Sequence, residues 1–276
     1  MRNSPPNSCP GSPPGKTALS SGPEDFPPGA TDQCELFGGR LTLTQPTDGY
    51  RFSLDSVLLA WWVEFSPGER ILDAGCGVGV VALALARCRG ARDVLGVELQ
   101  PALAALARAN VIANGAEALV SVREADLREL PPDLAGSFDV VCANPPFREA
   151  GGGRVNPSPG KAAARHELTL TLDELARAAA AALRPGGRFY FIHQPRRLPE
   201  IMAAAANAGL RMERLRFVQP AAAEAANLVL GAARAGGSRE TAVMPPLVIY
   251  GEGRDYGPEL AAIYEGDGKP LYGEEL

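Results

Sequence analysis

The chain has 276 residues, of which 46% are hydrophobic, and it carries a formal net charge of −5 at pH 7. This length allows one large domain with additions, and no apolar run reaches the ~18 residues that a membrane span needs. Residues 1–17 lack the apolar stretch of a secretory signal, the five cysteines form no CxxC pair, and His166 and His193 have no ligand partners at metal spacing. We therefore expect a cytoplasmic protein with no membrane partner, disulfide framework or metal.

The first 30 residues hold eight of the 25 prolines together with Ser and Gly, and they show no apolar period. Such a composition cannot bury a core, so we expect residues 1–30 to form a disordered tail. The remainder, 31–276, is predicted to be one domain. It divides into a hairpin and helix at 34–66, a core at 67–235 and a C-terminal extension at 236–276.

Two elements are predicted ahead of the core. The stretch ELFGGRLTLTQ predicts a hairpin around Gly38-Gly39. From Ser53 onward, apolar residues recur at helical spacing, which predicts a helix with Ser53 or Asp55 as its N-terminal cap and Pro67-Gly68 as its end.

Beyond these elements, short apolar strands alternate with helices. The predicted strands are 70–73, 93–98, 118–122, 138–142, 188–193, 215–218 and 227–232. The predicted helices are 78–87, 101–113, 171–183 and 198–208. This alternation indicates an α/β fold with a doubly wound, mostly parallel, seven-stranded sheet of Rossmann-like type. The last two strands have only a loop between them, which favours an antiparallel hairpin at the edge of the sheet.

The stretch DAGCGVG joins the first strand of this sheet to its helix. Gly75, Gly77 and Gly79 permit a tight turn and let a ligand lie against the backbone. A nicotinamide-binding loop would read GxGxxG, but position 80 is Val, so the pattern is DxGxGxG beginning at Asp73. The glycines fit either a ligand loop or a plain structural turn.

Two acidic residues follow at the ends of the next strands. Glu98 closes the second strand and can accept both ribose hydroxyls of a nucleoside, while Asp126 follows the third strand and can accept from an adenine amino group. Each acid alone would fit a surface carboxylate, but together with the glycines they stand where such folds bind ligands. Because no Walker lysine follows the loop, the predicted ligand is a nucleoside without phosphates.

The stretch NPPF follows the apolar strand at 138–142. Its two prolines remove two backbone donors and hold two φ angles at about −65°. Each proline also moves the preceding residue out of the helical region. The strand therefore ends in a stiff backbone that presents an amide and an aromatic ring.

DAGCGVG, GVEL, EADL and NPPF, in this order on consecutive strands, resemble the motifs of class I S-adenosylmethionine-dependent methyltransferases. NPPF is similar to the Asp/Asn/Ser-Pro-Pro-Tyr/Phe signature of those that methylate a planar amino nitrogen, with Phe in place of the commoner Tyr. The stretches LTQPTDGYRFSLD, YRFSLDSVLLAWW, RPGGRFYFIHQPRRL and PPLVIYGEGRDYGPEL resemble the family of tRNA1(Val) adenine N6-methyltransferases. The resemblance covers residues 34–264.

This resemblance implies S-adenosylmethionine as the cofactor. The residues that it assigns to cofactor binding are Arg51, Asp55, Asp73, Gly75, Cys76, Gly77, Gly79, Glu98, Leu99, Asp126, Leu127 and Asn144. In the family, the stretch at 50–55 lies over the methionine end of the cofactor. Arg51 is then expected to pair with the methionine carboxylate and Asp55 with its ammonium, unless Asp55 caps its helix instead.

The chemistry of NPPF agrees with methylation of an aromatic amine. The amine's lone pair is conjugated into its ring, and two hydrogen bonds accepted from its N–H groups favour a pyramidal nitrogen that faces the methyl. The predicted acceptors are the side-chain oxygen of Asn144 and the carbonyl of Pro145. Pro146 fixes their geometry and Phe147 stacks on the base, so positioning supplies most of the rate. These four residues are the predicted catalytic residues.

The local charge is compatible with a polyanion partner, and the family resemblance implies that this partner is RNA, specifically tRNA. Between Arg148 and Arg216 there are 12 Lys/Arg against 6 Asp/Glu, while the rest of the chain carries −11. Such a stretch fits either a polyanion site or an ordinary solvated surface. The phosphate-contact candidates in the Gly/Pro-rich loop after NPPF are Arg148, Arg154, Lys161 and Arg165. The target adenine has to be unstacked, as in an anticodon loop, and we expect a monomer.

Three other functions stay open on the sequence alone. A protein glutamine N5-methyltransferase would present a planar carboxamide nitrogen to the same acceptors, but its usual NPPY and its helical N-terminal domain are missing. A ribosomal RNA guanine N2-methyltransferase uses related NPPF motifs. A nucleoside-binding module without activity would not need an intact NPPF.

Overall fold

The computed structural model describes residues 30–47, 51–145, 170–237, 240–251, 255–266 and 268–272. The strands of this part are β1 (Thr31–Leu36), β2 (Leu41–Pro46), β3 (Arg70–Ala74), β4 (Asp93–Glu98), β5 (Val120–Glu124), β6 (Phe138–Ala143), β7 (Leu183–His193), β8 (Leu210–Gln219), β9 (Leu228–Ala235) and β10 (Ala242–Val248). The α-helices are α1 (Leu54–Trp62), α2 (Val80–Arg87), α3 (Pro101–Ala113), α5 (Leu172–Ala182), α6 (Leu198–Asn207) and α7 (Pro258–Glu265). Short 3-10 turns span Leu127–Glu129, Pro132–Leu134 and Pro195–Arg197. Apart from Ala30, the expected tail lies outside the described residues.

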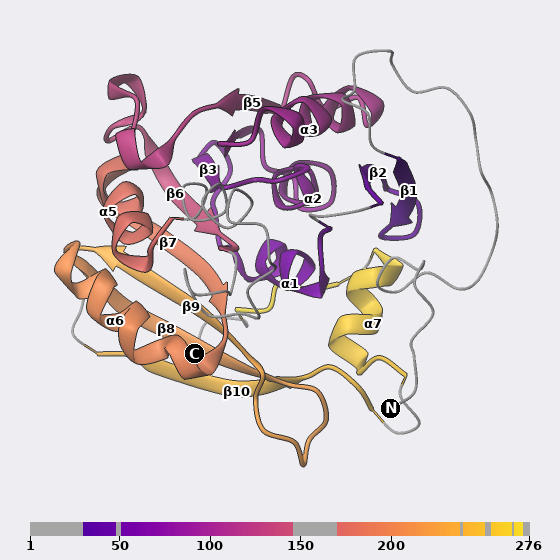
Figure 1. Cartoon of the computed structure of the whole chain (residues 1–276). Helices are drawn as coiled ribbons and strands as arrows, with labels where there is room; N and C mark the ends of the chain where they lie inside the picture. The colour runs from indigo at the N-terminus through magenta and orange to yellow at the C-terminus, as the bar shows by residue number, and fades with distance from the viewer. Residues whose placement is uncertain are drawn as a thin grey trace, which may run out of the picture.

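An eight-stranded sheet in the order β10-β8-β9-β7-β6-β3-β4-β5 organises the molecule (Figure 1). The strands from β7 to β5 run parallel, β9 runs antiparallel to both of its neighbours, and β10 runs parallel to β8. The predicted α/β class with a mostly parallel sheet is thus confirmed. The carboxyl ends of β3, β4, β6 and β7 meet at one edge of the sheet, where such folds bind ligands.

The eighth strand, β10, was not predicted and comes from the C-terminal extension. It adds to β8, so the β8–β9 hairpin lies inside the sheet and not at its edge. Pro245 and Pro246 fall where its register with β8 shifts, between Met244 and Leu247. Proline cannot donate to a β-ladder and is tolerated in an edge strand, which is why AVMPPLV does not resemble a strand by its pattern.

Helices cover both faces of the sheet because its buried strands are apolar on both sides. Neighbouring residues of a strand face opposite cores: Ile71 packs with α1, α2 and α3, whereas Leu72 packs with α5 and α6. On β6, Val140 and Val141 divide in the same way. This period of two along each strand holds the carboxyl edge between two helical layers.

The N-terminal hairpin is attached to the domain by two asparagines at the C-terminal end of α3, the second of which is its C-cap residue. Asn110 and Asn114 are one helical turn apart, and each bonds both backbone groups of a β2 residue. The Asn110 side chain accepts from Thr44 N at 2.8 Å and donates to Thr44 O at 2.9 Å. Asn114 does the same with Thr42, at 2.9 and 2.7 Å. The two amides therefore satisfy the free edge of β2 as a neighbouring strand would.

Helix α1 is anchored to distant parts of the chain. The indole N–H of Trp62, which is fully buried, donates to the carbonyl of Gly231 on β9 at 2.9 Å. The indole of Trp61 donates to the carbonyl of Gly268 at 3.1 Å, and the Leu271 N–H donates to the Trp61 carbonyl at 2.9 Å. These bonds fix α1 at its C-terminal end, and the first turn of the helix lies beside the carboxyl edge of the sheet, where Ser56 contacts Asn144. Ser53 is its N-cap residue, and Asp55 lies in its first turn.

Candidate active site

The glycine loop after β3 is shaped by left-handed backbone at three positions. Gly75, Gly77 and Gly79 have φ angles of 78°, 56° and 88°, which only glycine adopts readily. The Gly75 and Cys76 N–H groups donate to the Val97 carbonyl at 2.8 and 3.0 Å, so the loop is fastened to the end of β4. A Cβ added at Gly75 would meet no atom of the described structure within 4 Å. The loop therefore has open space beside it where a ligand can approach the backbone.

Glu98, at the end of β4, holds two turns together with one carboxylate. Its Oε2 accepts from the Gly77 N–H and its Oε1 accepts from the Gln100 N–H, both at 2.9 Å. The side chain is buried, with 6% exposure. Each carboxylate oxygen has further lone pairs, so Glu98 can accept from ribose hydroxyls without releasing either backbone group.

Asp73 is the most deeply buried acid of the site, with 2% exposure. Its Oδ2 accepts from the Ala82 N–H in the first turn of α2 at 3.1 Å. Burial raises the pKa of this carboxyl to about 7, the Ala82 hydrogen bond opposes the rise, and the nearby charge of Glu98 adds to it. Asp73 is therefore an anchor between β3 and α2, beneath the glycine loop.

Asp126, expected near an adenine amino group, is engaged by Arg128. The Arg128 guanidinium donates to both oxygens of the Asp126 carboxylate, from Nε at 3.0 and 2.9 Å and from Nη2 at 2.6 Å, and the Arg128 backbone N–H donates at 2.9 Å. The hydrogen bonds from Arg128 lower the pKa of this carboxyl. Asp126 remains about one quarter exposed, with a side-chain exposure of 28%.

Asn144 follows β6 and its amide is held from one side. Its Nδ2 donates to the hydroxyl of Ser56, on α1, at 3.1 Å. Ser56 itself has 2% exposure. An amide whose nitrogen is engaged in this way turns its oxygen, Oδ1, to the other side. Of the remaining NPPF residues, Pro145 is described, whereas Pro146 and Phe147 lie outside the described residues.

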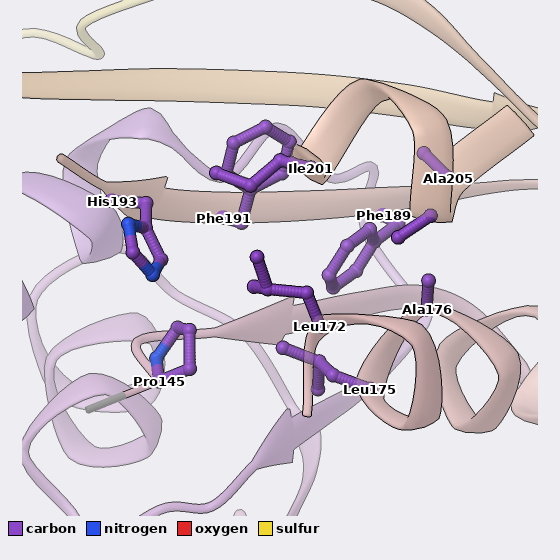
Figure 2. A pocket seen from close by; sticks show the side chains of 10 residues that line it. Pro145, Leu172, Leu175, Ala176, Phe189, Phe191, His193, Ile201 and Ala205 are labelled. Carbon is purple, nitrogen blue, oxygen red and sulfur yellow. The ribbon is translucent and has the colours of Figure 1, made fainter. Parts of the chain in front are cut away.

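Pro145 borders an apolar pocket between α5, α6 and β7 (Figure 2). The ten lining residues are apolar except His193, and the cavity volume is about 20 Å³. Figure 2 shows Pro145 and His193 together at one end of this pocket, away from Ala176 and Ala205. A volume of this size suits a water molecule and not a purine, so a base at this edge has to lie outside the pocket.

His193 ends β7 and is buried with 2% exposure. Its Nδ1 accepts from the Gln194 N–H at 2.7 Å. Burial, aided by the positive charge of Arg197, lowers the pKa of this imidazole to about 4. His193 is therefore neutral at pH 7 with its proton on Nε2.

Arg51 and Asp55 have defined surroundings near the start of α1. The Arg51 guanidinium forms an ion pair with Asp32 on β1 at 2.9 Å and donates to the Pro46 carbonyl at 3.1 Å. Arg51 thus ties the hairpin to the segment before α1, and its expected pairing with a methionine carboxylate would compete with Asp32. Burial raises the pKa of the Asp55 carboxyl, and the Ser53 hydroxyl partly offsets that rise.

Four arginines between residues 148 and 216 form ion pairs with acidic residues elsewhere in the chain, which neutralises part of the basic charge of this segment. The arginines paired with carboxylates outside that segment are Arg184 with Asp139, Arg188 with Glu69, Arg214 with Glu64 and Arg216 with Glu259. The predicted phosphate contacts Arg148, Arg154, Lys161 and Arg165, as well as His166, lie outside the described residues. Binding of a polyanion would therefore depend on the loop after NPPF more than on the described arginines.

Ser56 and His193 also lie at this edge, and no sequence motif predicted a function for either. In SLDSVLL, Ser56 is one polar position among apolar ones, and nothing in that pattern points 88 residues onward to Asn144. Within the described ranges, no three His, Cys, Asp or Glu side chains are grouped so that they hold a metal ion. No helix of that same part is long and apolar enough to cross a membrane.

The glycine loop, Glu98 and Asn144 lie along one edge of a mostly parallel sheet, and this arrangement defines a class I S-adenosylmethionine-dependent methyltransferase. Residues 53–207 match the sequence model of the family described as "Methyltransferase small domain", and the chain belongs to this family. It is an S-adenosylmethionine-dependent N-methyltransferase, and the open, positive-φ glycine loop fits that cofactor.

Curated relatives agree with this assignment, and a solved structure shares the fold. A tRNA1(Val) (adenine(37)-N6)-methyltransferase from Dickeya chrysanthemi is 30% identical over 214 residues, which cover 76% of this chain and 84% of the relative. One from Porphyromonas gingivalis is 33% identical over 187 residues, covering 65% and 72%. The crystal structure of a predicted O-methyltransferase from Agrobacterium tumefaciens has a TM-score of 0.62 at 24% identity, over 78% of this chain and 97% of that chain. The predicted resemblance is thereby confirmed, and the last structure shares the fold.

Proposed function

We propose that the chain transfers a methyl group to the exocyclic N6 of an adenine in RNA, namely an anticodon-loop adenosine of a tRNA of the tRNA1(Val) type. The observation that carries this proposal is the Asn144 amide at the end of β6, whose nitrogen is engaged on one side while its oxygen faces the other. The activities for which the relatives from Dickeya chrysanthemi and Porphyromonas gingivalis are named support the choice of nucleotide and RNA.

In the proposed reaction, S-adenosylmethionine supplies the methyl group when bound, and a C–N bond forms as its S–C bond breaks. Asn144 Oδ1 and the Pro145 carbonyl accept the two N–H groups of the adenine amine, which directs the nitrogen lone pair at the methyl. Phe147 stacks on the base and Pro146 keeps the two acceptors in place. After transfer, one amine proton leaves to solvent, so no side chain has to act as a general base.

The remaining predicted residues take their parts in this proposal. The cofactor is held by the glycine loop with Asp73 and Cys76, by Glu98 and Leu99 at the ribose, and by Asp126 and Leu127 at the adenine. Arg51 and Asp55 face its methionine end. The loop residues Arg148, Arg154, Lys161 and Arg165 contact RNA phosphates. The domain that performs these steps is 31–276, with a catalytic core at 67–235.

The proposal is tested with a labelled methyl donor and three acceptors offered side by side: unmodified tRNA, ribosomal RNA and a glutamine-containing release-factor peptide. We expect label in tRNA alone, and nuclease digestion should release it as N6-methyladenosine. Label recovered as N2-methylguanosine would refute the adenine assignment while keeping RNA as substrate. Label confined to the peptide would refute the RNA assignment.

A further inference from the structure

Asn144 is bonded to a residue that no part of the proposed reaction uses. The Ser56 hydroxyl accepts from Asn144 Nδ2 at 3.1 Å, across 88 residues of sequence and between α1 and the end of β6. Ser56 is buried with 2% exposure in the first turn of α1. A buried hydroxyl is costly unless it is hydrogen-bonded, so its placement opposite this one amide requires an explanation.

The hydroxyl is fixed because its helix is fixed. Two tryptophans of α1 donate indole hydrogen bonds to remote carbonyls, Trp62 to Gly231 on β9 and Trp61 to Gly268. At the end of the same helix, the Arg89 guanidinium donates to the carbonyls of Ala60 and Val63 at 2.6 and 2.7 Å. Ser56 therefore presents its oxygen from a rigid element, and a site built on such an element holds its geometry best.

The two ends of the Asn144 amide are not equivalent in amine methylation. Oδ1 accepts from the target N–H, whereas Nδ2 would meet the same N–H donor to donor. Rotation of the amide by half a turn would therefore replace the required acceptor by a repelling donor. In the structure, the Ser56 hydroxyl lies on the far side of the amide and accepts from Nδ2, which holds the amide with Oδ1 facing away from Ser56.

We propose that Ser56 is a positioning residue for methyl transfer: it accepts from Asn144 Nδ2 and thereby keeps Asn144 Oδ1 directed at the substrate amine. This inference rests on the proposed function of Asn144. A positioning role and a purely structural role of Ser56 predict different effects of removing its hydroxyl. A hydroxyl that only completes packing would change the melting temperature, whereas a positioning hydroxyl changes kcat and acts only while Asn144 is present.

The test compares Ser56→Ala with Ser56→Thr, which keeps a hydroxyl at the position. We expect Ser56→Ala to lower kcat by about 10- to 100-fold, as the loss of a group that orients a reacting residue does elsewhere. Its affinity for S-adenosylhomocysteine should be unchanged, and Ser56→Thr should recover most of kcat. In an Asn144→Ala background, Ser56→Ala should have no further effect, because the two residues then form one unit.

The matched control is Ser137→Ala at the opposite end of β6, where the hydroxyl donates to the Asp133 carbonyl at 2.9 Å. This variant should keep kcat. Two results would overturn the positioning role. One is a Ser56→Ala enzyme with wild-type kcat, and the other is a Ser56→Ala substitution that lowers kcat by the same factor in the Asn144→Ala background as in the wild type.

A readout that does not use activity separates this inference from the proposed function. The side-chain amide signal of Asn144 in a 15N NMR spectrum, assigned by its loss in Asn144→Ala, should shift in Ser56→Ala and stay in place in Ser56→Thr. If the signal does not respond to Ser56→Ala, the inference fails even though the wild type methylates adenine. If the wild type leaves adenine unlabelled, the proposed function fails and the amide signal still decides whether Ser56 orients Asn144.

Discussion

The two halves of the carboxyl edge are built in different ways. At the ends of β3 and β4, the proposed cofactor half is held by backbone groups no more than 21 residues from the acid that they bond: Glu98 bonds Gly77 and Gln100, and Asp73 bonds Ala82. At the end of β6, the acceptor half is held by a side chain from another element, since Asn144 bonds Ser56 across 88 residues. Pro145 likewise borders a pocket made by α5, α6 and β7.

This difference explains which half a motif can describe. The glycine loop bonds its own backbone and the end of the next strand, so two short motifs, DAGCGVG and GVEL, are enough to predict its geometry. An amide whose orientation depends on a remote helix has no local signature. Variants in the first half should therefore change cofactor affinity, and variants in the second half should change the rate of transfer.

The strongest separation of the two halves is expected from Asn144→Ala. Removing one aimed acceptor should raise the barrier by ~2.7–4 kcal/mol, a loss of about 10²–10³ in kcat, by analogy with oxyanion-hole donors. Calorimetric affinity for S-adenosylhomocysteine should stay at the wild-type value. A variant that transfers methyl at the wild-type rate would remove NPPF from the mechanism.

A pH experiment on Asp73 concerns the cofactor half alone. Its folded pKa of about 7 lies above the ordinary value of 3.8, so the folded protein keeps a proton that the unfolded chain loses as pH rises from about 4 to about 7. This group therefore lowers the stability across that interval, on the order of 2–4 kcal/mol. Asp73→Asn removes the slope, and its melting temperature relative to wild type should rise with pH. A pH-independent difference would contradict the buried, protonated carboxyl.

Glu98→Ala should act on cofactor affinity and leave the orientation of Asn144 unchanged. Loss of charge-assisted hydrogen bonds should weaken cofactor binding by ~1.5–3 kcal/mol in calorimetry, and freeing the Gly77 and Gln100 N–H groups should also loosen the loop. Glu124→Ala is the matched control, since Glu124 pairs with Glu98 in the ladder and is exposed. Equal affinities for Glu98→Ala and wild type, with the fold intact, would defeat this assignment.

The charge of the loop after NPPF should appear in the salt dependence of RNA binding. Neutralising Arg154 and Lys161 with Gln should flatten the slope of log K against log salt by about one unit for each phosphate that the side chains no longer reach. Arg184→Gln is the comparison variant, because Arg184 already pairs with Asp139 at 2.9 Å. A double variant with the wild-type slope would show that these two side chains do not touch phosphate.

The smallest effect is expected from deleting the N-terminal tail. A chain that starts at Thr31 should keep its cofactor affinity, its kcat and its melting temperature, because the Pro/Ser/Gly composition of residues 1–30 cannot bury a core. Titration calorimetry, the transfer assay and differential scanning calorimetry measure these three quantities in turn. A truncated chain that melts well below the full one would show that the tail stabilises the folded domain.

The sequence predicted the alternating core because each of its elements carries its own periodicity. Where the predicted end of a strand is wrong, the observed end is set by pairing with the neighbouring strand. β7 begins at Leu183 and not at 188, since Leu183 pairs with Phe138 and a register shift follows. Gly187 permits this approach: a Cβ there would lie 3.1 Å from the Asp139 carbonyl and 2.8 Å from Leu183. The helix α7 and the strand β10 were missed because the prolines and glycines around them obscure any period.

For the site, the motifs identified the positions but not every contact. The glycines and Glu98 lie together as their spacing predicts, whereas the Arg128 partner of Asp126 and the Asp32 partner of Arg51 were not foreseen. An acid at a strand end is compatible with either a ligand or an arginine, and single-sequence patterns do not distinguish the two. Ser56 was missed because its partner is remote in the sequence.

The anchoring of α1 has a consequence for how the enzyme is made. Trp61 bonds Gly268, which leaves the ribosome 207 residues later. At about 5–20 residues per second, this interval lasts about 10–40 s. During that time the helix that carries Ser56 lacks one of its anchors, while the glycine loop can already close on β4. A growing chain should thus be able to bind the cofactor before it can transfer a methyl group. A translation-arrested intermediate would then bind S-adenosylmethionine without transferring its methyl group.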